Sequence, residues 1–291
     1  MIVASKCVSG DRRLGASYDA AIKGNTMIVD IHTHIFPPRF IEERARLLAL
    51  EPGFAALYAD PRARMADAEG LLTSMDGAGV DVSVAAGFWW QDRALAEEHA
   101  AYLVEAAARA DGRIVPFVPL LAPGAPGDAV GVGEVREVDP ARIVAGGLPL
   151  LVHCSEEVGH AYPGKSGGLS PGGLWSLLEA QPDARVIAAH WGGGFPFYAL
   201  MPEVRAVIDA RRLVFDTAAS AFLYGHEARE PAGAVRRGID LVGLDAVCWG
   251  SDFPLREQSV DRDAIEAALQ PGRERDAVLG ENAARFLGLS S

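Results

Sequence analysis

Met27-Ile-Val-Asp-Ile-His-Thr-His34 is an apolar run that ends in two histidines spaced one residue apart. Runs of Ile and Val are typical of a β-strand, in which residues i and i+2 point to the same face. His32 and His34 are therefore expected side by side, with Thr33 facing the other way. Two imidazoles on one face of one strand can both bind a single cation.

Seven more apolar runs follow, and helical patterns separate most of them. The predicted strands are 27–31, 80–86, 114–120, 132–135, 148–153, 185–190, 213–216 and 246–250. The predicted helices are 62–78, 93–110, 174–180, 202–211, 229–238, 260–269 and 273–287. Strands that alternate with helices pair in parallel, and eight such units predict an α/β fold, a (β/α)₈ TIM barrel. An open doubly wound sheet is the alternative, but no Gly-x-Gly-x-x-Gly follows the first strand.

The connection between the fourth and fifth predicted strands is short. It consists of the 11 residues 137–147, whereas a parallel crossover needs roughly a dozen. Asp139-Pro-Ala-Arg-Ile-Val-Ala-Gly-Gly147 could supply about two turns of helix. We expect this crossover to be the most distorted of the barrel.

Composition narrows the class of protein. The chain has 291 residues, 49% of them hydrophobic, and a formal net charge of −12, which argues against nucleic acid or an anionic membrane as a partner. No apolar stretch approaches the ~18 residues of a membrane span. Three widely spaced cysteines predict reduced thiols in a cytoplasmic protein. Residues 1–26 are expected to be a poorly ordered N-terminal extension of a barrel over residues 27–291.

Three more apolar runs end in metal-binding residue types. His153, His190 and Asp252 each precede a Gly-rich or polar loop. Barrel enzymes carry their active sites at the C-terminal ends of the strands, so these side chains should converge with His32 and His34. Imidazoles with one carboxylate suit Zn²⁺, and Mn, Fe or Co would also fit. Such a metal polarises a substrate oxygen or activates a water, whose proton Asp252 could accept.

The chain resembles the amidohydrolase superfamily, in its amidohydrolase-related branch. This branch combines metal-dependent hydrolases with decarboxylases similar to aminocarboxymuconate-semialdehyde decarboxylase. The resemblance spans roughly residues 27–288 and is carried by Asp30-Ile-His-Thr-His34, Val152-His153, Ala189-His-Trp-Gly-Gly193, Gly250-Ser-Asp-Phe-Pro254 and Leu279-Gly-Glu-Asn-Ala-Ala-Arg-Phe-Leu287.

The resemblance implies roles for five side chains. His32, His34, His153 and Asp252 would hold the metal, and His190 would act as a catalytic acid or polarise a carbonyl. It also implies a homodimer. Some members of the superfamily carry a metal-bridging residue at the end of the fourth strand, where this chain offers Glu134. A bridging role and an ordinary polar position at a strand end are equally compatible with the sequence, so one metal or two remain open.

Other residues are candidates for binding substrate. Trp89, in Phe88-Trp-Trp90 after the second strand, would form a pocket wall for a flat substrate, although packing against the first loop explains it nearly as well. Arg136 could pair with a substrate anion. Lys165 lies in Gly159-His-Ala-Tyr-Pro-Gly-Lys-Ser166, which matches the phosphate-loop pattern of nucleotide-binding proteins. That pattern needs a helix starting at the Lys, and the Gly-Gly-Leu-Ser-Pro that follows breaks helices, so nucleotide binding is rejected. Lys165 could instead bind a substrate carboxylate or be a solvated surface residue.

The sequence thus predicts a metal-dependent enzyme acting on a small molecule. The first expectation is hydrolysis of an amide, lactone or ester by a metal-activated water. The alternative is non-oxidative decarboxylation of an aromatic or unsaturated acid, which a basic residue facing the carboxylate would favour. A non-catalytic protein with a structural metal is less consistent, because such sites are usually closed four-ligand sets rich in Cys. His99, on a helix, is expected to be solvated.

Overall fold

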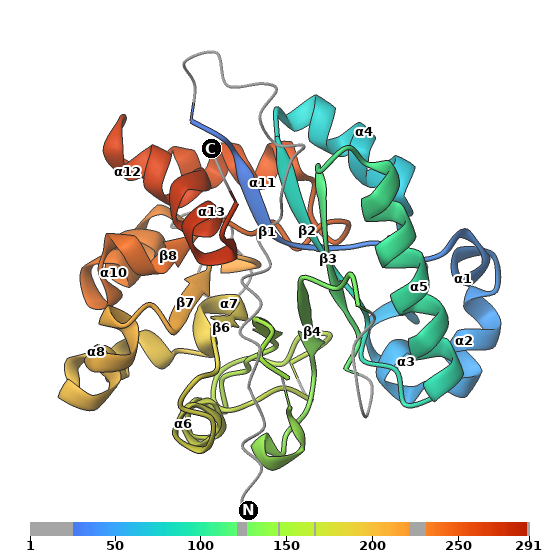
Figure 1. Cartoon of the computed structure of the whole chain (residues 1–291), viewed down its shortest axis with the longest axis horizontal. Coiled ribbons are helices and arrows are strands. Elements are labelled where there is room, and N and C mark those ends of the chain that lie inside the picture. Colours follow the sequence, from blue (N-terminus) through green and yellow to red (C-terminus); the bar gives the residue numbers. More distant parts are fainter. Residues whose placement is uncertain (1–25, 121–126, 145, 166, 221–230, 290–291) are drawn as a thin grey trace, which may run out of the picture.

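The computed structural model describes residues 26–120, 127–144, 146–165, 167–220 and 231–289. The predicted N-terminal extension, save residue 26, lies outside these ranges. Eight parallel strands form a nearly closed barrel with the helices around it, which confirms the predicted (β/α)₈ fold (Figure 1). The strands follow one another in chain order, whereas an open doubly wound sheet would reverse direction at a switch point.

All eight predicted strands are present. They are β1 (Val29–His34), β2 (Val82–Ala86), β3 (Ile114–Val118), β4 (Gly131–Val135), β5 (Leu150–Val152), β6 (Val186–Ala188), β7 (Leu213–Asp216) and β8 (Val247–Cys248). The segment after β8 returns to β1, where the Ile31 amide donates to the Trp249 carbonyl (3.0 Å) and the Asp252 amide to the His32 carbonyl (2.9 Å). These hydrogen bonds bring the β8 loop against the two histidines of β1.

Helices fill most of the connections. They are α1 (Pro38–Glu42), α2 (Arg44–Leu50), α3 (Pro52–Tyr58), α4 (Ala68–Ala78), α5 (Arg93–Arg109), α6 (Pro171–Ala180), α7 (Ala189–Gly192), α8 (Pro202–Asp209), α10 (Pro231–Val242), α11 (Gln258–Glu266), α12 (Arg273–Asp276) and α13 (Asn282–Leu287). Side-chain caps fix several starts: Asp67 accepts from the Gly70 amide at α4, and Ser170 from the Gly173 amide at α6. The predicted helix 62–78 therefore begins only at Ala68.

Two buried layers hold the barrel together. Alternate strand residues such as Val29, Val84 and Phe117 form the interior, which the last helix closes with Phe286 and Leu287. The intervening strand residues pack outward against the helices. This packing makes the barrel interior a solid core, so chemistry is confined to the loops at the strand ends.

The first loop differs from the prediction, because it contains α1, α2 and α3 beside α5 (Figure 1). Phe36, Phe40 and Phe54 of this segment pack with Phe88 and Trp90 in one buried aromatic cluster. Each of these helices is short, and such helices are stabilised by tertiary packing rather than by their own propensity.

The β4–β5 crossover is as irregular as its length suggests. Within the described residues, 137–144 and 146–147, it contains only the 3₁₀ turn Pro140–Arg142, less than the two helical turns that the sequence could supply. The β4–β5 register also shifts between Val132 and Val135. The predicted helix 273–287 is present as three consecutive pieces, α12, a π-helical turn (Ala277–Glu281) and α13. No helix among the described residues is both long and apolar enough to span a bilayer.

Candidate metal centre

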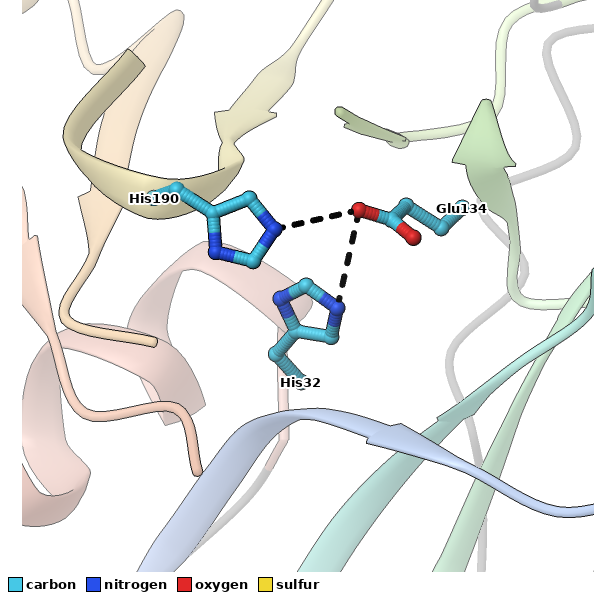
Figure 2. A group of neighbouring side chains, drawn as sticks. All are labelled: His32, Glu134 and His190. Atoms are coloured by element: carbon cyan, nitrogen blue, oxygen red, sulfur yellow. Dashed lines mark ion pairs between the residues drawn. The ribbon is translucent and has the colours of Figure 1, made fainter. Parts of the chain in front are cut away.

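The structure brings the strand-end residues to one rim of the barrel. His32 and His34 end β1, Glu134 lies on β4, His153 follows β5, His190 lies in α7 directly after β6, and Asp252 follows β8. All six residues are buried, with at most 8% of their surface exposed. Figure 2 shows three of them, from β1, β4 and α7, pointing toward one another, with a Glu134 oxygen between the two imidazoles.

Acceptors behind the β1 histidines fix the direction of their lone pairs. His32 Nδ1 lies 2.8 Å from Asp216 Oδ2, and His34 Nδ1 lies 3.2 Å from the Ala86 carbonyl oxygen. Each Nδ1 must therefore carry the hydrogen, which leaves the Nε2 lone pair of each neutral ring facing inward. The two Nε2 atoms are 3.1 Å apart.

His190 is oriented in the same way. Its Nδ1 lies 3.2 Å from the Ala218 carbonyl oxygen, and its Nε2 lies 3.4 Å from Glu134 Oε1. The backbone of His190 is left-handed (φ 56°), a conformation that non-glycine residues seldom adopt and that is common at functional sites. The Asp216 carboxylate accepts from the His190 amide at 2.8 Å and holds this turn.

Two groups of side chains have ligand atoms close enough for one ion. One group is His32, His34 and Asp252; the other is His32, Glu134 and His190. Asp252 Oδ1 lies 3.8 Å from His32 Nε2 and 3.5 Å from His34 Nε2, and Glu134 Oε1 lies 3.8 Å from His32 Nε2. The donor set of imidazole nitrogens and carboxylate oxygens fits a divalent transition metal.

His153 stands apart from both groups. Its Nδ1 lies 2.7 Å from Glu134 Oε1 and 3.1 Å from Arg136 Nη2, and its Nε2 lies 3.0 Å from the Gly164 carbonyl oxygen. The His153 ring thus contacts the centre through Glu134, while its Nε2 is turned to the β5 loop.

The backbone permits this convergence at two glycines. A Cβ on Gly133 would lie 2.5 Å from the Leu151 carbonyl oxygen, and Gly133 has a φ of 151°. A Cβ on Gly250 would lie 2.9 Å from His32 Cβ. Glycine before Glu134 and before the Asp252 loop therefore lets neighbouring strands approach closely enough for the side chains to meet.

The electrostatics of the cluster favour an added positive charge. Burial opposes a charge on His32, but Asp216, Glu134 and Asp252 outweigh it and raise its pKa to about 10. Burial lowers the pKa of His34. Burial also opposes ionisation of Glu134, yet His153 and Arg136 hold its pKa well below its usual range. The centre is thus rich in inward acceptors, and either a proton or a metal ion satisfies them.

Asp216 and Asp30 are site residues that the sequence analysis missed. Asp216 ends β7 and is fully buried, with its carboxylate divided between His32 and the His190 turn. Asp30 is also fully buried and accepts from the Ser251 amide (3.0 Å) and the Gln258 amide group (2.8 Å), which fastens β1 to the β8 loop. The rule that selected His190, a polar side chain ending an apolar run, also selects Asp216.

A cavity of about 1160 Å³ is connected to the centre through Arg136, which lines it and contacts Glu134 and His153, and it contains two of the predicted substrate-binding residues. Trp89 and Arg136 both line it, together with Phe88, Leu120 and Gly167. Phe88 and Trp90 also belong to the buried aromatic cluster, so the Phe-Trp-Trp segment both packs and forms a wall.

Lys165 occupies a different position. Its ammonium donates to the carbonyls of Val158 (2.6 Å) and His160 (2.8 Å) and lies 3.6 Å from Glu156. It does not line the cavity beside the centre. The next helix after this loop begins at Pro171, and Ser166 lies outside the described residues. Lys165 therefore ties the loop together in this structure.

The expectation that His99 is solvated was wrong, since its ring is fully buried. His99 Nδ1 accepts from the Trp90 indole (2.9 Å), and its Nε2 lies 2.7 Å from the Ile35 carbonyl oxygen. The neutral tautomer with a hydrogen on Nε2 satisfies both contacts. The reason for the error is that the first loop, which covers this face of α5, is helical and packed.

Comparison with solved structures finds the same barrel. 5-Carboxyvanillate decarboxylase from Novosphingobium aromaticivorans, solved with manganese, is 15% identical with a TM-score of 0.66, covering 91% of this chain and 97% of that one. 2,6-Dihydroxybenzoate decarboxylase from Rhizobium is 14% identical with a TM-score of 0.63, covering 92% and 100%. A protein named as a candidate 2-pyrone-4,6-dicarboxylic acid hydrolase, from Pseudomonas putida, is 15% identical with a TM-score of 0.64, covering 92% and 99%.

Sequence comparison supplies the family. No curated protein sequence matches. The sequence profile of the amidohydrolase family matches residues 140–289, just over half of the chain. That region contains His153, His190 and Asp252, together with the missed carboxylate Asp216. The chain belongs to the amidohydrolase family.

Proposed function

We propose that the protein is a metal-dependent decarboxylase of an aromatic or unsaturated carboxylic acid. The observation that supports the proposal is the contact of Arg136 with Glu134 and His153 at the candidate metal centre. Its guanidinium lies 3.1 Å from His153 Nδ1 and 3.4 Å from Glu134 Oε2, and the same side chain lines the large cavity. A basic group between the candidate metal centre and an aromatic cavity wall suits a flat substrate whose carboxylate faces the metal centre.

The proposed metal ligands are His32, His34 and Asp252, with Glu134 beside them. Both candidate groups use His32, whose single Nε2 lone pair can bind only one ion. This favours one metal over two and makes Glu134 an additional ligand rather than a bridge. His153, predicted as a ligand, would reach the ion only after its Nδ1 leaves Glu134 and Arg136.

The identity of the metal is part of the proposal. Zn²⁺ was the first expectation, and imidazole ligands suit it. The solved decarboxylases from Novosphingobium aromaticivorans and Polaromonas hold manganese, and two carboxylates in the set suit Mn²⁺. Either ion, when bound, would act as a Lewis acid on a substrate oxygen.

The remaining chemistry belongs to the chain's own residues. Arg136 binds the substrate carboxylate, and Trp89 stacks on its ring. When the bond between the ring carbon and the carboxylate breaks, the electron pair stays on the ring carbon and CO₂ leaves. The imidazolium form of His190, whose Nδ1 hydrogen is held by the Ala218 carbonyl, donates its Nε2 proton to that carbon and becomes neutral.

Hydrolysis of a lactone is the second candidate, because the Pseudomonas putida neighbour is named for a pyrone dicarboxylate. In that reaction Asp252 would accept a proton from the attacking water, and Arg136 would hold a carboxylate that survives the reaction. The two reactions differ in product, since only decarboxylation releases CO₂.

The test is a product assay on protein loaded with Mn²⁺ or Zn²⁺. The panel contains 5-carboxyvanillate, 2,6-dihydroxybenzoate and 2-pyrone-4,6-dicarboxylate, each labelled with ¹³C in the carboxylate, and is run in D₂O. The proposal predicts labelled CO₂ and one deuterium on the ring carbon. Ring opening of the pyrone without CO₂ would instead support hydrolysis.

Arg136→Gln supplies the matched variant. It should retain metal but weaken substrate binding by about tenfold or more, the loss of one charged hydrogen-bonding partner. Arg93→Gln, which removes an exposed arginine from the same cavity, should change KM little. Equal effects of the two substitutions would remove Arg136 from substrate recognition.

A further inference from the structure

The opposite end of the barrel also carries a hollow. It lies beside the starts of β6, β7 and β8, whose C-terminal ends hold the candidate metal centre. Arg185 precedes β6, Arg212 precedes β7, Asp245 lies two residues before β8, and Arg285 lies on α13. These residues line one cavity of about 370 Å³, a volume at the small end of ligand pockets.

The side chains that line this cavity carry a net positive charge, whereas the protein as a whole is negative. Four arginines line it, Arg185, Arg211, Arg212 and Arg285, with two aspartates, Asp183 and Asp245. A second cavity of about 370 Å³ shares Arg211 and Asp245 and adds Arg205 and Arg273 against Asp209. The two cavities thus have a positive balance in a chain of net charge −12.

Some of these arginines already make hydrogen bonds within the protein and are not available to bind a ligand. Arg212 donates to the Leu178 and Gln181 carbonyls (3.0 and 2.9 Å), and Arg205 donates to the Val242 carbonyl (2.8 Å), so both fasten loops. Arg285 donates a hydrogen bond from one nitrogen to Asn282 Oδ1 (3.2 Å). Within the part of the chain that the structure describes, the other nitrogens of Arg285 make no hydrogen bond or ion pair and can contact a ligand.

The surroundings of Arg185 give the strongest indication that an anion binds here. Its guanidinium carbon lies 4.6 Å from the centre of the Phe286 ring, within the range of a cation–π contact. Across the described residues, the side chains of Arg185 and Arg211 make no hydrogen bond and no ion pair. Burial lowers the pKa of the Arg185 guanidinium. A half-buried cation without a counter-charge is costly unless an anion completes it.

We propose that this cavity binds a small, multiply charged oxyanion, a phosphate-bearing or polycarboxylate metabolite, through Arg185, Arg211 and Arg285. Guanidinium groups match such oxygens with paired N–H donors. Asp183 and Asp245 lie at the same cavity and favour a ligand that also carries hydroxyl groups, because a carboxylate accepts from a hydroxyl.

The test is isothermal titration calorimetry on the metal-loaded full chain, with pyrophosphate and citrate as probes at low ionic strength. Arg185→Gln/Arg285→Gln is compared with the charge-matched control Arg62→Gln/Arg109→Gln, whose side chains are 89% and 66% exposed. A His32→Ala/His34→Ala variant reports any binding at the metal centre. Circular dichroism confirms that each variant is folded.

The proposal predicts saturable binding of at least one probe in the wild type, the Arg62/Arg109 control and the His32/His34 variant. The Arg185→Gln/Arg285→Gln variant should raise Kd by about a hundredfold, about tenfold for each charged hydrogen bond that is lost. Equal affinity in the Arg185/Arg285 variant and the control would overturn the proposal. So would loss of binding in the His32/His34 variant, or absence of saturable binding of both probes to the wild type.

Discussion

The Nε2 atoms of His32 and His34 lie 3.1 Å apart, so a proton or a metal ion must lie between their lone pairs. Asp216 holds the Nδ1 hydrogen of His32, and the Ala86 carbonyl holds that of His34. Two lone pairs at this distance repel unless a cation lies against both. The position of the acceptors behind the rings, rather than the histidines alone, therefore makes this pair suited to a metal.

Asp216→Asn tests that role. The amide NH₂ can donate to His32 Nδ1, which would move the ring hydrogen to Nε2 and into the metal position. We expect metal affinity to fall by about 10- to 100-fold, as for other partners of metal-bound histidines. Competition with a fluorescent chelator measures it, and Asp209→Asn, an exposed carboxylate on α8, serves as the control. Unchanged affinity in Asp216→Asn would show that the tautomer does not matter.

His190→Asn separates catalysis from metal binding. The proposed metal ligands do not include His190, so the variant should retain the ion measured in the wild type. Its turnover should fall by about 10²–10⁴-fold, the usual contribution of a general acid or base. Wild-type turnover would exclude His190 as the proton donor, and loss of the metal would place it among the ligands.

Trp89 and Trp90 are adjacent but should respond differently to replacement by alanine. Trp90 is 7% exposed within the aromatic cluster, so Trp90→Ala should lower the free energy of unfolding by about 3–5 kcal/mol. Trp89 lines the cavity, so Trp89→Ala should chiefly raise KM. Urea unfolding and steady-state kinetics on both variants give the comparison, and the reverse pattern would contradict this division.

His99 should make stability depend on pH. Burial lowers its pKa from 6.5 to about 4, so below pH 6.5 the unfolded chain binds a proton that the native protein excludes. The His99 contribution is complete above pH 6.5 and is lost as the pH falls toward 4, by about 2 kcal/mol between pH 8 and pH 5. Urea unfolding at both pH values should show this loss relative to His99→Gln. The same pH dependence in both proteins would contradict it.

Strand-end chemistry was readable from the sequence because the barrel converts a position in the chain into a position on the rim. An apolar run places its last residues at one end of the barrel, which is why His32, His190 and Asp252 could be located before the structure was known. The same rule applies to Asp216, which was noted only as the end of a strand.

Other features depend on contacts that no local pattern encodes. The helical first loop is stabilised by Phe36 and Phe54 packing on Phe88, so neither its helices nor the burial of His99 could be inferred from spacing. Likewise, side-chain direction decides that His153 faces Glu134 and Gly164, and spacing along a strand does not fix a side-chain rotamer.

The most direct measurement is the metal content of the purified protein by elemental mass spectrometry, after dialysis without chelator and after reconstitution with Mn²⁺ or Zn²⁺. The control is the His32→Ala/His34→Ala variant, checked for folding by circular dichroism. The account predicts about one equivalent of divalent transition metal in the wild type and almost none in the variant. Equal metal content in the two proteins, or none in the reconstituted wild type, would contradict it.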